Sequence, residues 1–427
     1  MLRVMGVGAA ALPFAHLIAG AAQQNYVEPP RVAYPGSDDA LLDEIERAAF
    51  DFFWTEAGAT GQVKDRALLN GHDTHTVASI AATGFGLTGL CIASQRAYGK
   101  KQEIIERVRA TLRFLWEKLP HEHGFYYHFI DANSGERQWK CEISSIDTSL
   151  LLCGVLSARA HFDDSEIQDL ATKIYGRVDW PWMLNGGPTF SMGWHPESGF
   201  LDARWEHYCE LMMIYLLAMG SPTHPVSAET WKAWKRTTVK FHGIEYISGD
   251  DPLFTHQYSQ AWFDFRGKRD AYADYFENSV KATKAHKEFC LSLHDEFPDY
   301  SDHLWGITAS DSAEGYQAWG GPPRLGKLDG SIVPCAPGGS LPFVFQDCMQ
   351  VLRTIRERYG KAWGRYGFVD AFDPLTNWYN PDVLGIDQGI TMVMAENQRT
   401  GFVWKTFMKN KEAQRGMERA GFQAETA

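Results

Sequence analysis

The sequence has no pair of cysteines or histidines at the spacing that a metal ion needs. Its seven cysteines are scattered, and an odd number does not suit a complete disulfide framework. Structural zinc needs clustered Cys and His ligands, so it is disfavoured. No glycine-rich phosphate cradle follows a predicted strand. We therefore expect catalysis without a metal or an organic cofactor. A Ca²⁺ ion that loop carboxylates bind for stability remains an alternative.

Basic residues are also few. Lys and Arg together number 41 against 53 Asp and Glu, so the formal net charge is −12. Without a basic stripe to neutralise phosphates, neither a nucleic acid nor an anionic membrane is a suitable partner. No charge run or low-complexity tract marks a disordered domain. We expect a monomer that acts on a neutral or cationic substrate.

Long hydrophobic runs are missing as well. The N-terminal stretch MLRVMGVGAAALPFAHLIAGAAQQ is too short and too rich in Ala and Gly for a membrane span. It has one Arg, a small apolar run and an A-x-A arrangement at Ala19 and Ala21, which suits signal peptidase. This pattern predicts a signal peptide over residues 1–21 and a periplasmic or secreted protein, free of the membrane after processing. A disordered or interfacial N-terminus is the alternative.

Aromatic side chains, in contrast, are abundant. The chain has 15 Trp, 17 Tyr and 25 Phe. Most of them should belong to the core. Flat aromatic faces that packing does not need suit the apolar faces of sugar rings, so a carbohydrate is a natural ligand.

Apolar residues recur at helical spacing along most of the chain. The segment 38–57 opens with acidic residues, which favour a helix N-terminus. The segment 74–97 is apolar nearly all round, so it predicts an inner helix. Only 124–131 and 332–335 favour short strands. An all-α toroid of inner helices sheathed by outer ones is predicted, with further helices at 101–118, 143–160, 164–178, 203–219, 226–240, 270–294, 341–358 and 387–399.

Long loops rich in Gly, Pro and aromatic residues precede the inner helices. Such loops usually hold functional residues on a rigid scaffold. We expect them to surround a cavity at the active-site face, where the apolar helices begin. The chain then divides into the signal peptide, an N-terminal extension (22–37), one catalytic domain (38–410) and a C-terminal tail (411–427).

Many motifs in these helices and loops resemble the bacterial glucoamylase-like domain, which includes the endo-β-1,2-glucanases. The resemblance runs from about residue 40 to about residue 410. It implies an (α/α)6 barrel and an inverting glycoside hydrolase active on β-1,2-glucans. The motifs are DFFWTEA, TGFGLTGL, EISSIDTSLLLCG, RVDWPWML, MGWHPESGFL, LAMGSPTHP, THQYSQAWFDFRG, DYFENSVKAT, WGITASD, GYQAWGGPP, GFVDAFDP, GIDQGITMVMAEN and TGFVWKTFM.

Glycoside hydrolysis needs one carboxylic acid to protonate the leaving oxygen and one carboxylate to activate water or attack carbon. Glu210 enters a very apolar stretch, so its pKa should rise and suit a general acid. The alternative is a buried Glu that bonds to a loop backbone. Glu206 lies one predicted helical turn earlier on the same face and suits a supporting role.

Glu142 and Asp147 flank the sequence ISSI at the start of another apolar helix. Helix capping explains one of the polar residues there but not the whole group. Glu142 is the second candidate for the acid. Asp147 suits sugar hydroxyls or the orientation of a neighbour.

Asp387 and Gln388 lie between Gly385 and Gly389, which let the backbone approach a ligand. A helix N-cap is the alternative reading of Asp387. The family resemblance points to this Asp as a carboxylate important for activity, and we assign it the general base. In a hydrated loop it should stay ionised, with Gln388 helping to place a water.

The remaining candidates are sugar contacts in the loops. Asp264 and Arg266, two residues apart, can fork onto vicinal hydroxyls or brace each other in a structural ion pair. The other predicted contacts are Trp194, His256, Gln257, Asp311, Tyr316 and Trp319.

Three rival functions are weaker. A polysaccharide lyase needs uronate substrates and cationic groups, and a sugar epimerase works with His pairs. A non-catalytic glycan-binding protein would keep the aromatic residues but would have no need for two carboxylates in desolvated surroundings. Hydrolysis of another glucan, as by a glucoamylase-like or β-glucosidase-like enzyme, is the nearest alternative.

Overall fold

The computed structural model describes residues 30–424. The predicted signal peptide, and the extension as far as residue 29, lie outside this range. Within it, no helix combines the length and apolar character needed to cross a membrane. The long helices are α2 (Asp38–Thr55), α3 (Ile80–Arg96), α4 (Lys101–Glu117), α5 (Ser145–His161), α6 (Ser165–Gly176), α11 (Tyr275–Ser292), α13 (Phe345–Arg358) and α14 (Gly385–Thr400).

Shorter helices connect or cover the long ones. They are α7 (Trp180–Leu184), α8 (Met212–Gly220), α9 (Glu229–Ala233), η1 (Leu253–His256), α10 (Tyr258–Trp262), α12 (Cys335–Gly338), η2 (Gly360–Ala362), α15 (Phe402–Phe407) and α16 (Lys411–Arg419).

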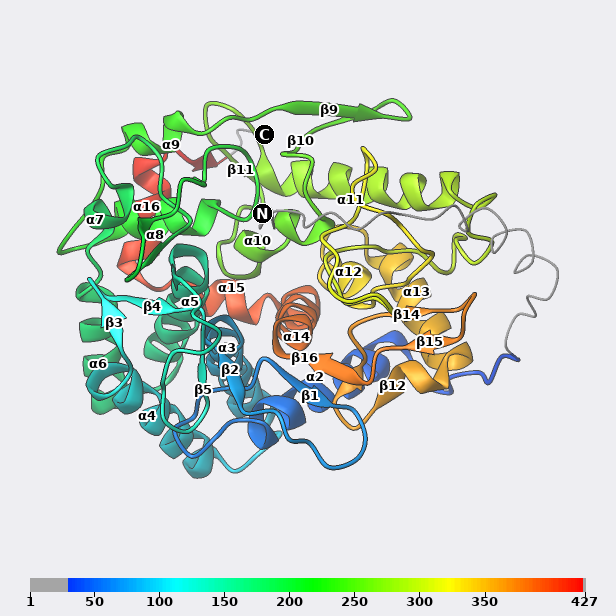
Figure 1. Ribbon diagram of the computed structural model, residues 1–427, viewed down its shortest axis with the longest axis horizontal. Helices are drawn as coiled ribbons and strands as arrows, with labels where there is room; N and C mark the ends of the chain where they lie inside the picture. The colour runs from blue at the N-terminus through cyan, green and yellow to red at the C-terminus, as the bar shows by residue number, and fades with distance from the viewer. Residues whose placement is uncertain (1–29, 425–427) are drawn as a thin grey trace.

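The helices form two layers. Inner helices such as α3, α5 and α8 are buried along most of their length, because their residues are apolar all round. Outer helices such as α4, α6 and α13 bury one apolar stripe and expose a charged face. Figure 1 shows α11 and α13 at the periphery, with α14 and α10 nearer the middle.

Close approach of the inner helices depends on glycine. A Cβ atom added at Gly154 of α5 would lie 2.1 Å from the carbonyl oxygen of Gly84 in α3. A Cβ atom added at Gly84 would lie 2.4 Å from the carbonyl oxygen of Leu150. The two backbones therefore pack without intervening side chains, and a side chain at either position would push α3 and α5 apart.

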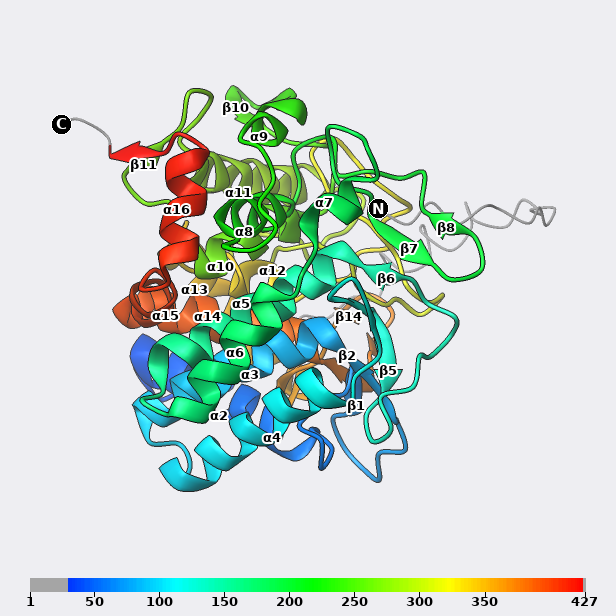
Figure 2. The ribbon, with the colours of Figure 1, turned by 90° about the vertical axis from the view of Figure 1, so that its left-hand side faces the viewer.

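Short strands gather at the end where α3, α5 and α14 begin. Strand β2 leads into α3, β6 into α5, and β16 into α14. Figure 2 shows strands β1, β2 and β5 to β8 on one side of the molecule and α15 and α16 on the opposite side. The strands at this end are β1 (Arg66–Leu68), β2 (Val77–Ser79), β3 (His121–Glu122), β4 (Phe125–Tyr127), β5 (Phe129–Asp131), β6 (Ile143–Ser144), β7 (Gly193–His195), β8 (Gly199–Phe200) and β16 (Asp382–Leu384).

These strands pair antiparallel and hold the loops in place. The largest sheet has the order β3-β4-β6-β7-β8, and β1 pairs with β16 while β2 pairs with β5. The remaining strands form small hairpins or edge pairs: β9 (Thr238–Phe241), β10 (Ile244–Ile247), β11 (Lys268–Arg269), β12 (Trp363–Gly364), β13 (Gly367–Phe368), β14 (Phe372–Asp373), β15 (Trp378–Tyr379) and β17 (Gln423–Ala424).

The mainly helical fold and most of the predicted long helices are confirmed, but two predictions are wrong. The segment 203–219 is helical only from Met212, and its first nine residues are a loop. Glu206 and Glu210 therefore do not share a helix face. The segment 226–240 holds only the five-residue α9 before strand β9 begins, because the β-branched residues Thr237, Thr238 and Val239 favour the strand.

Of the two predicted strand segments, one is confirmed and one is wrong, and the predicted tail is part of the fold. The segment 124–131 does form strands β4 and β5. The segment 332–335 forms no strand; it has one bridge from Ile332 to Phe372, and α12 follows. Residues 411–424, which we separated from the domain as a tail, pack against it: α16 lies along α8, and β17 pairs with β11.

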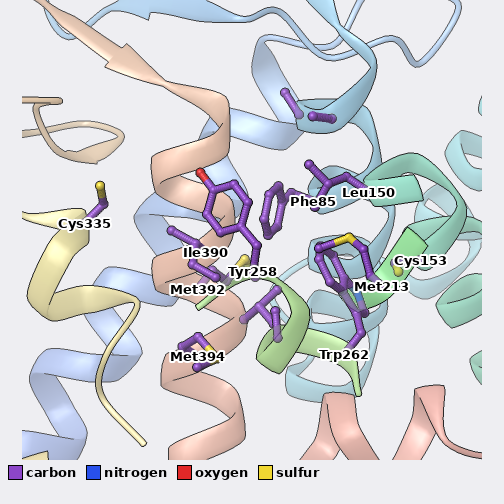
Figure 3. Packing of buried hydrophobic residues seen from close by; sticks show 14 of the residues in the cluster. Phe85, Leu150, Cys153, Met213, Tyr258, Trp262, Cys335, Ile390, Met392 and Met394 are labelled. Carbon is purple, nitrogen blue, oxygen red and sulfur yellow. The ribbon is translucent and has the colours of Figure 1, made fainter. Parts of the chain in front are cut away.

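The core is continuous through both layers. Figure 3 shows Phe85 of α3 beside Tyr258 and Trp262 of α10, with Ile390, Met392 and Met394 of α14 nearby. Phe85 meets the Tyr258 ring edge-on at 5.7 Å between centroids. This packing supports the floor of a cavity that opens at the strand end.

Candidate active site

A cavity of about 680 Å³ lies where the inner helices begin. Loops before α5, α8 and α14 and the segment before α12 contribute its walls. Five of the predicted site residues line it: Glu142, Asp147, Glu210, Tyr316 and Asp387. Its further lining includes His128, Met192, His195, Leu201, Arg204, Trp205, Glu206, His207, Phe254, Tyr258, Ser310, Cys335, Ile386 and Ile390.

Glu210 is nearly buried and stands two residues before α8. Its side chain is 7% exposed, and its carbonyl oxygen accepts a hydrogen bond of 2.7 Å from Ser259 Oγ. Burial raises the pKa of Glu210 to about 7. A carboxyl in this state holds a proton near neutral pH and can give it to an oxygen in the cavity.

Asp387 belongs to the first turn of α14, not to a loop. It is 5% exposed, and its Oδ2 atom has no donor partner among the described residues. Burial and the charge of Asp370 raise the pKa of Asp387 well above its ordinary value. Our expectation that this Asp would be hydrated and ionised is therefore wrong, because α14 begins two residues earlier than predicted and carries Asp387 inward.

Asp370 is the neighbour that dominates the surroundings of Asp387. The two buried carboxyls interact, and Asp370 Oδ1, like Asp387 Oδ2, has no donor partner within the described part of the chain. Burial raises the pKa of Asp370 to about 7. Two carboxyls this close cannot both ionise easily, so they hold one proton between them.

A polar network fixes the far oxygen of Asp370. Its Oδ2 atom accepts hydrogen bonds of 2.8 Å from the Asp311 backbone N–H and from Asn380 Nδ2. Arg66 Nη1 donates to Asp311 Oδ2 at 2.7 Å. Asp311, predicted as a sugar contact, does not line the cavity; it orients Asp370 instead.

His128 lies between two other carboxylates that line the cavity, Glu142 and Asp147. Its Nδ1 lies 3.0 Å from Glu142 Oε1, and its Nε2 lies 3.4 Å from Asp147 Oδ1. Although burial acts to lower it, the carboxylates of Asp147 and Glu142 raise the pKa of His128 to about 9. Despite partial burial, the bond from His128 lowers the pKa of Glu142. Ser144 Oγ donates to Asp147 Oδ2 at 2.5 Å.

These three residues also have the spacing of possible metal ligands, with one ligand atom from each within 4.8 Å of the others. Both ring nitrogens of His128, however, already face carboxylates. An imidazole offers one nitrogen to a metal ion, so this arrangement suits an imidazolium held by two carboxylates better than a chelate.

Comparison with known proteins identifies the family. The family model Glycoamylase, described as "Putative glucoamylase", matches residues 202–411. A "putative glucoamylase" structure from Bacteroides fragilis is 30% identical, with a TM-score of 0.85, over 93% of this chain and 100% of that one. The chain belongs to the glucoamylase-like family.

Two further proteins that this chain is similar to have named activities. An endo-β-1,2-glucanase from Chitinophaga pinensis, solved with sophorotriose and glucose, is 29% identical with a TM-score of 0.85, over 91% of this chain and 99% of that one. An exo β-1,2-glucooligosaccharide sophorohydrolase from Parabacteroides distasonis is 27% identical over 90% of this chain. This chain spans 58% of the length of that sophorohydrolase.

Three predicted sugar contacts of this family member are core residues. His256 is 3% exposed, and its Nδ1 lies 3.2 Å from the hydroxyl of Tyr208. Gln257 is fully buried and donates from Nε2 to the carbonyl of Ala336 at 2.8 Å. Gln388 donates to the carbonyl of Phe368 at 2.9 Å. None of them lines the cavity, because each side chain ties one inner segment to another.

Four further predicted contacts lie outside the cavity lining. Asp264 and Arg266 form a bidentate ion pair at 2.8 and 2.9 Å, the structural alternative, and the guanidinium lies over the Trp404 ring. Trp319 is 1% exposed and donates to Ser310 Oγ. Trp194 packs on Trp182 with 5.8 Å between ring centroids. Although all four residues were predicted in loops that face the cavity, none of their side chains lines it.

The predicted site left out His128, and it left out Asp370 although Asp370 is one of the carboxylates in the aromatic loops. His128 lies in the strand segment 124–131, next to the loop containing Glu142, and its polar side chain among aromatic residues was the available signal. Asp370 follows Val369 in GFVDAFDP, a motif that resembles the family. The distance in sequence between Asp370 and Asp387 hid their contact.

Proposed function

We propose that this protein hydrolyses β-1,2-linked glucans or their oligosaccharides with inversion at the anomeric carbon. The observation that carries the proposal is one cavity lined by two buried carboxyls of raised pKa, Glu210 and Asp387. Two relatives that match about nine tenths of the chain are an endo-β-1,2-glucanase and an exo β-1,2-glucooligosaccharide sophorohydrolase. The cavity's apolar lining, with Trp205, Tyr258 and Tyr316, suits the flat faces of glucosyl rings.

The scaffold we propose is an (α/α)6 barrel. Along the chain the buried helices α3, α5, α8, α10, α12 and α14 alternate with peripheral ones. Contacts link α14 to α3, α3 to α5 and α5 to α8, while α10 and α12 both reach α14. These contacts support a closed inner ring sheathed by α2, α4, α6, α11, α13 and α16.

Glu210 is the general acid in this proposal. Its protonated form donates to the glycosidic oxygen, and the apolar start of α8 keeps the proton in place until substrate binds. Glu142 is the weaker candidate because the bond from His128 keeps it ionised. We assign Glu142 and Asp147, with His128, to the binding of sugar hydroxyls.

The general base is the Asp370–Asp387 pair, which carries one proton and one negative charge. Asp387 lines the cavity and Asp370 lies behind it. The Asp311 N–H and Asn380 stabilise the charge on Asp370, so the shared proton favours Asp387 until water enters. When a water attacks the anomeric carbon, the pair takes its proton, and the other water atoms form the new hydroxyl.

An inverting mechanism requires room for that water between the carboxyl groups of Glu210 and Asp387. The carboxyl carbons of the acid and the base should lie roughly 6.5–9.5 Å apart, against about 5–5.5 Å for a retaining enzyme. A proton relay through a substrate hydroxyl or a water would allow a longer separation.

The deciding experiment is a substrate screen with product stereochemistry. Purified protein is incubated with linear β-1,2-, β-1,3-, β-1,4- and α-1,4-glucans, and reducing ends are measured with and without EDTA. We expect release only from the β-1,2-glucan, unaffected by EDTA, with the α anomer formed first by NMR. A first-formed β anomer would reject inversion, and activity restricted to another linkage would reject the substrate.

Export is a separate proposal that the N-terminal sequence supports. The A-x-A arrangement after a small apolar run suits cleavage before Ala22. N-terminal sequencing of protein from the periplasmic fraction should begin near Ala22. Protein that retained Met1 in the cytoplasm would contradict this.

A further inference from the structure

Trp139 differs from every other tryptophan in the chain. All 15 tryptophans lie in the described range, and 14 of them are buried or half-buried, whereas the Trp139 side chain is 66% exposed. A single exposed apolar side chain is not in itself evidence of a site, so its backbone and its neighbours have to show whether it has a use. Trp139 therefore presents an indole face to solvent that no other described tryptophan presents.

Hydrogen bonds hold the loop of Trp139 firmly. Arg137 donates from Nε to the carbonyl of Cys141 at 2.5 Å and from Nη2 to the carbonyl of Lys140 at 2.6 Å. The Gln138 N–H donates to the carbonyl of Phe129 at 3.0 Å. Trp139 itself has a φ of 51°, a left-handed conformation that costs energy for a bulky residue. The hydrogen bonds of the loop thus keep Trp139 in a strained backbone conformation in which its ring is exposed.

The same loop contacts residues that line the cavity, although none of residues 137–140 is in the lining itself. Arg137 Nη2 lies 3.1 Å from His195 Nδ1, and His195 lines the cavity. The ring of Trp139 meets Phe129 edge-on at 5.0 Å, and Phe129 stacks on His128, which lines the cavity too. A continuous aromatic path therefore leads from the cavity wall to the exposed ring.

We infer that Trp139 is a stacking platform for a glucosyl residue of a substrate chain that extends out of the cavity. The inference rests on the proposed function and adds a subsite to it. An exposed indole face offers a flat apolar surface to the C–H face of a sugar. Lys140, the next residue, is exposed as well and adds a polar side chain to the same loop.

The experiment compares long and short β-1,2-gluco-oligosaccharides as substrates of wild type and Trp139→Ala. We expect KM for the long chains to rise about 2- to 10-fold in Trp139→Ala, the range typical of one lost aromatic contact, while kcat and the KM for the shortest substrate stay unchanged. Trp139→Phe should restore most of the affinity. Tyr272→Ala removes an exposed aromatic ring outside the cavity lining and should leave every KM unchanged.

An equal KM ratio of long to short chains in wild type and Trp139→Ala would overturn the inference. A readout without turnover separates this from failure of the proposed function. Glu210→Gln protein is titrated with the same long oligosaccharides by calorimetry, with and without Trp139→Ala, after thermal melts confirm folding. Weaker binding in the double variant supports the platform even if wild type proves inactive, and unchanged binding rejects it.

Discussion

Two groups of carboxylates share one cavity but differ in what compensates their charge. Glu142 and Asp147 face the imidazole of His128, which lies within 3.0 and 3.4 Å of them. Glu210 and Asp387 form no ion pair with any described Lys, Arg or His, and burial raises the pKa of both. The paired group is fitted to hold polar substrate groups, and the uncompensated group is fitted to move protons.

The sharpest test of this difference is Glu210→Gln. Removing the general acid should lower kcat by at least about 10²-fold on β-1,2-glucan, because Gln cannot donate the proton. Glu206→Gln is the matched control, since Glu206 lines the same cavity but is exposed. Steady-state kinetics of both variants checks the prediction, and near wild-type kcat in Glu210→Gln would contradict it.

The same substitution should alter stability with pH. The folded pKa of Glu210, about 7, exceeds its unfolded value, so its contribution is lost as pH rises through 7. Glu210→Gln should therefore gain up to about 1–3 kcal/mol over wild type at pH 8 and little at pH 4. Thermal melts at both pH values measure this, and an equal difference at both would count against a raised pKa.

Asp387→Asn tests the base in the uncompensated group. We expect a loss of kcat of about 10²-fold or more, with the fold intact, since the amide cannot accept the proton of water. Added azide gives a matched control, because a small anion can replace a lost carboxylate and restore turnover. Full activity of Asp387→Asn would assign the base elsewhere.

His128→Gln removes the compensation from the paired group. KM should rise more than kcat falls, because Glu142 and Asp147 then repel each other and lose their orientation. The folded pKa of His128, about 9, lies above its unfolded value, so its stabilisation is present below about pH 6.5 and is lost as pH rises through 9. The stability loss in His128→Gln should accordingly shrink above pH 9. A pH-independent loss in thermal melts would reject the ion-paired imidazolium.

Asp370→Asn should have a smaller effect than the substitutions above, and it should appear in the pH dependence of kcat/KM. Without the second carboxyl, the pKa of Asp387 should fall, and the acidic limb of kcat/KM should move to lower pH by about one unit or more. Asn380→Ala is the comparison, since it removes a donor to Asp370 and should move that limb to higher pH. A purely structural role of Asp370 would lower activity without moving the limb.

Asp264→Asn should have the smallest effect of all. Its bidentate bond to Arg266 lies outside the cavity lining, and exposed ion pairs contribute about 0–1 kcal/mol. We expect unchanged kcat and KM and a change of Tm within a few degrees. A large rise in KM would restore Asp264 to the site.

Much of the fold followed from apolar periodicity. The spacing in 38–57 predicted α2, and the unbroken apolar character of 74–97 predicted an inner helix, α3. The periodicity failed at 203–211, where Trp205, Tyr208 and Cys209 are buried in a loop. Local spacing cannot tell a buried loop from a buried helix, because the tertiary surroundings bury both.

By itself, the sequence determined the helical layers and which carboxyls stand near apolar helix starts, since both depend on neighbours in the chain. It indicated the raised pKa of Glu210, but it could not decide the protonation of Asp387 or the exposure of the loop residues. Asp370 and Asp387 meet only because β16 and α14 return the chain beside the segment 369–371, and Trp319 and Gln257 are buried only because other segments cover them. The pKa of a carboxyl depends on what surrounds it from every direction, and that is fixed by the tertiary structure.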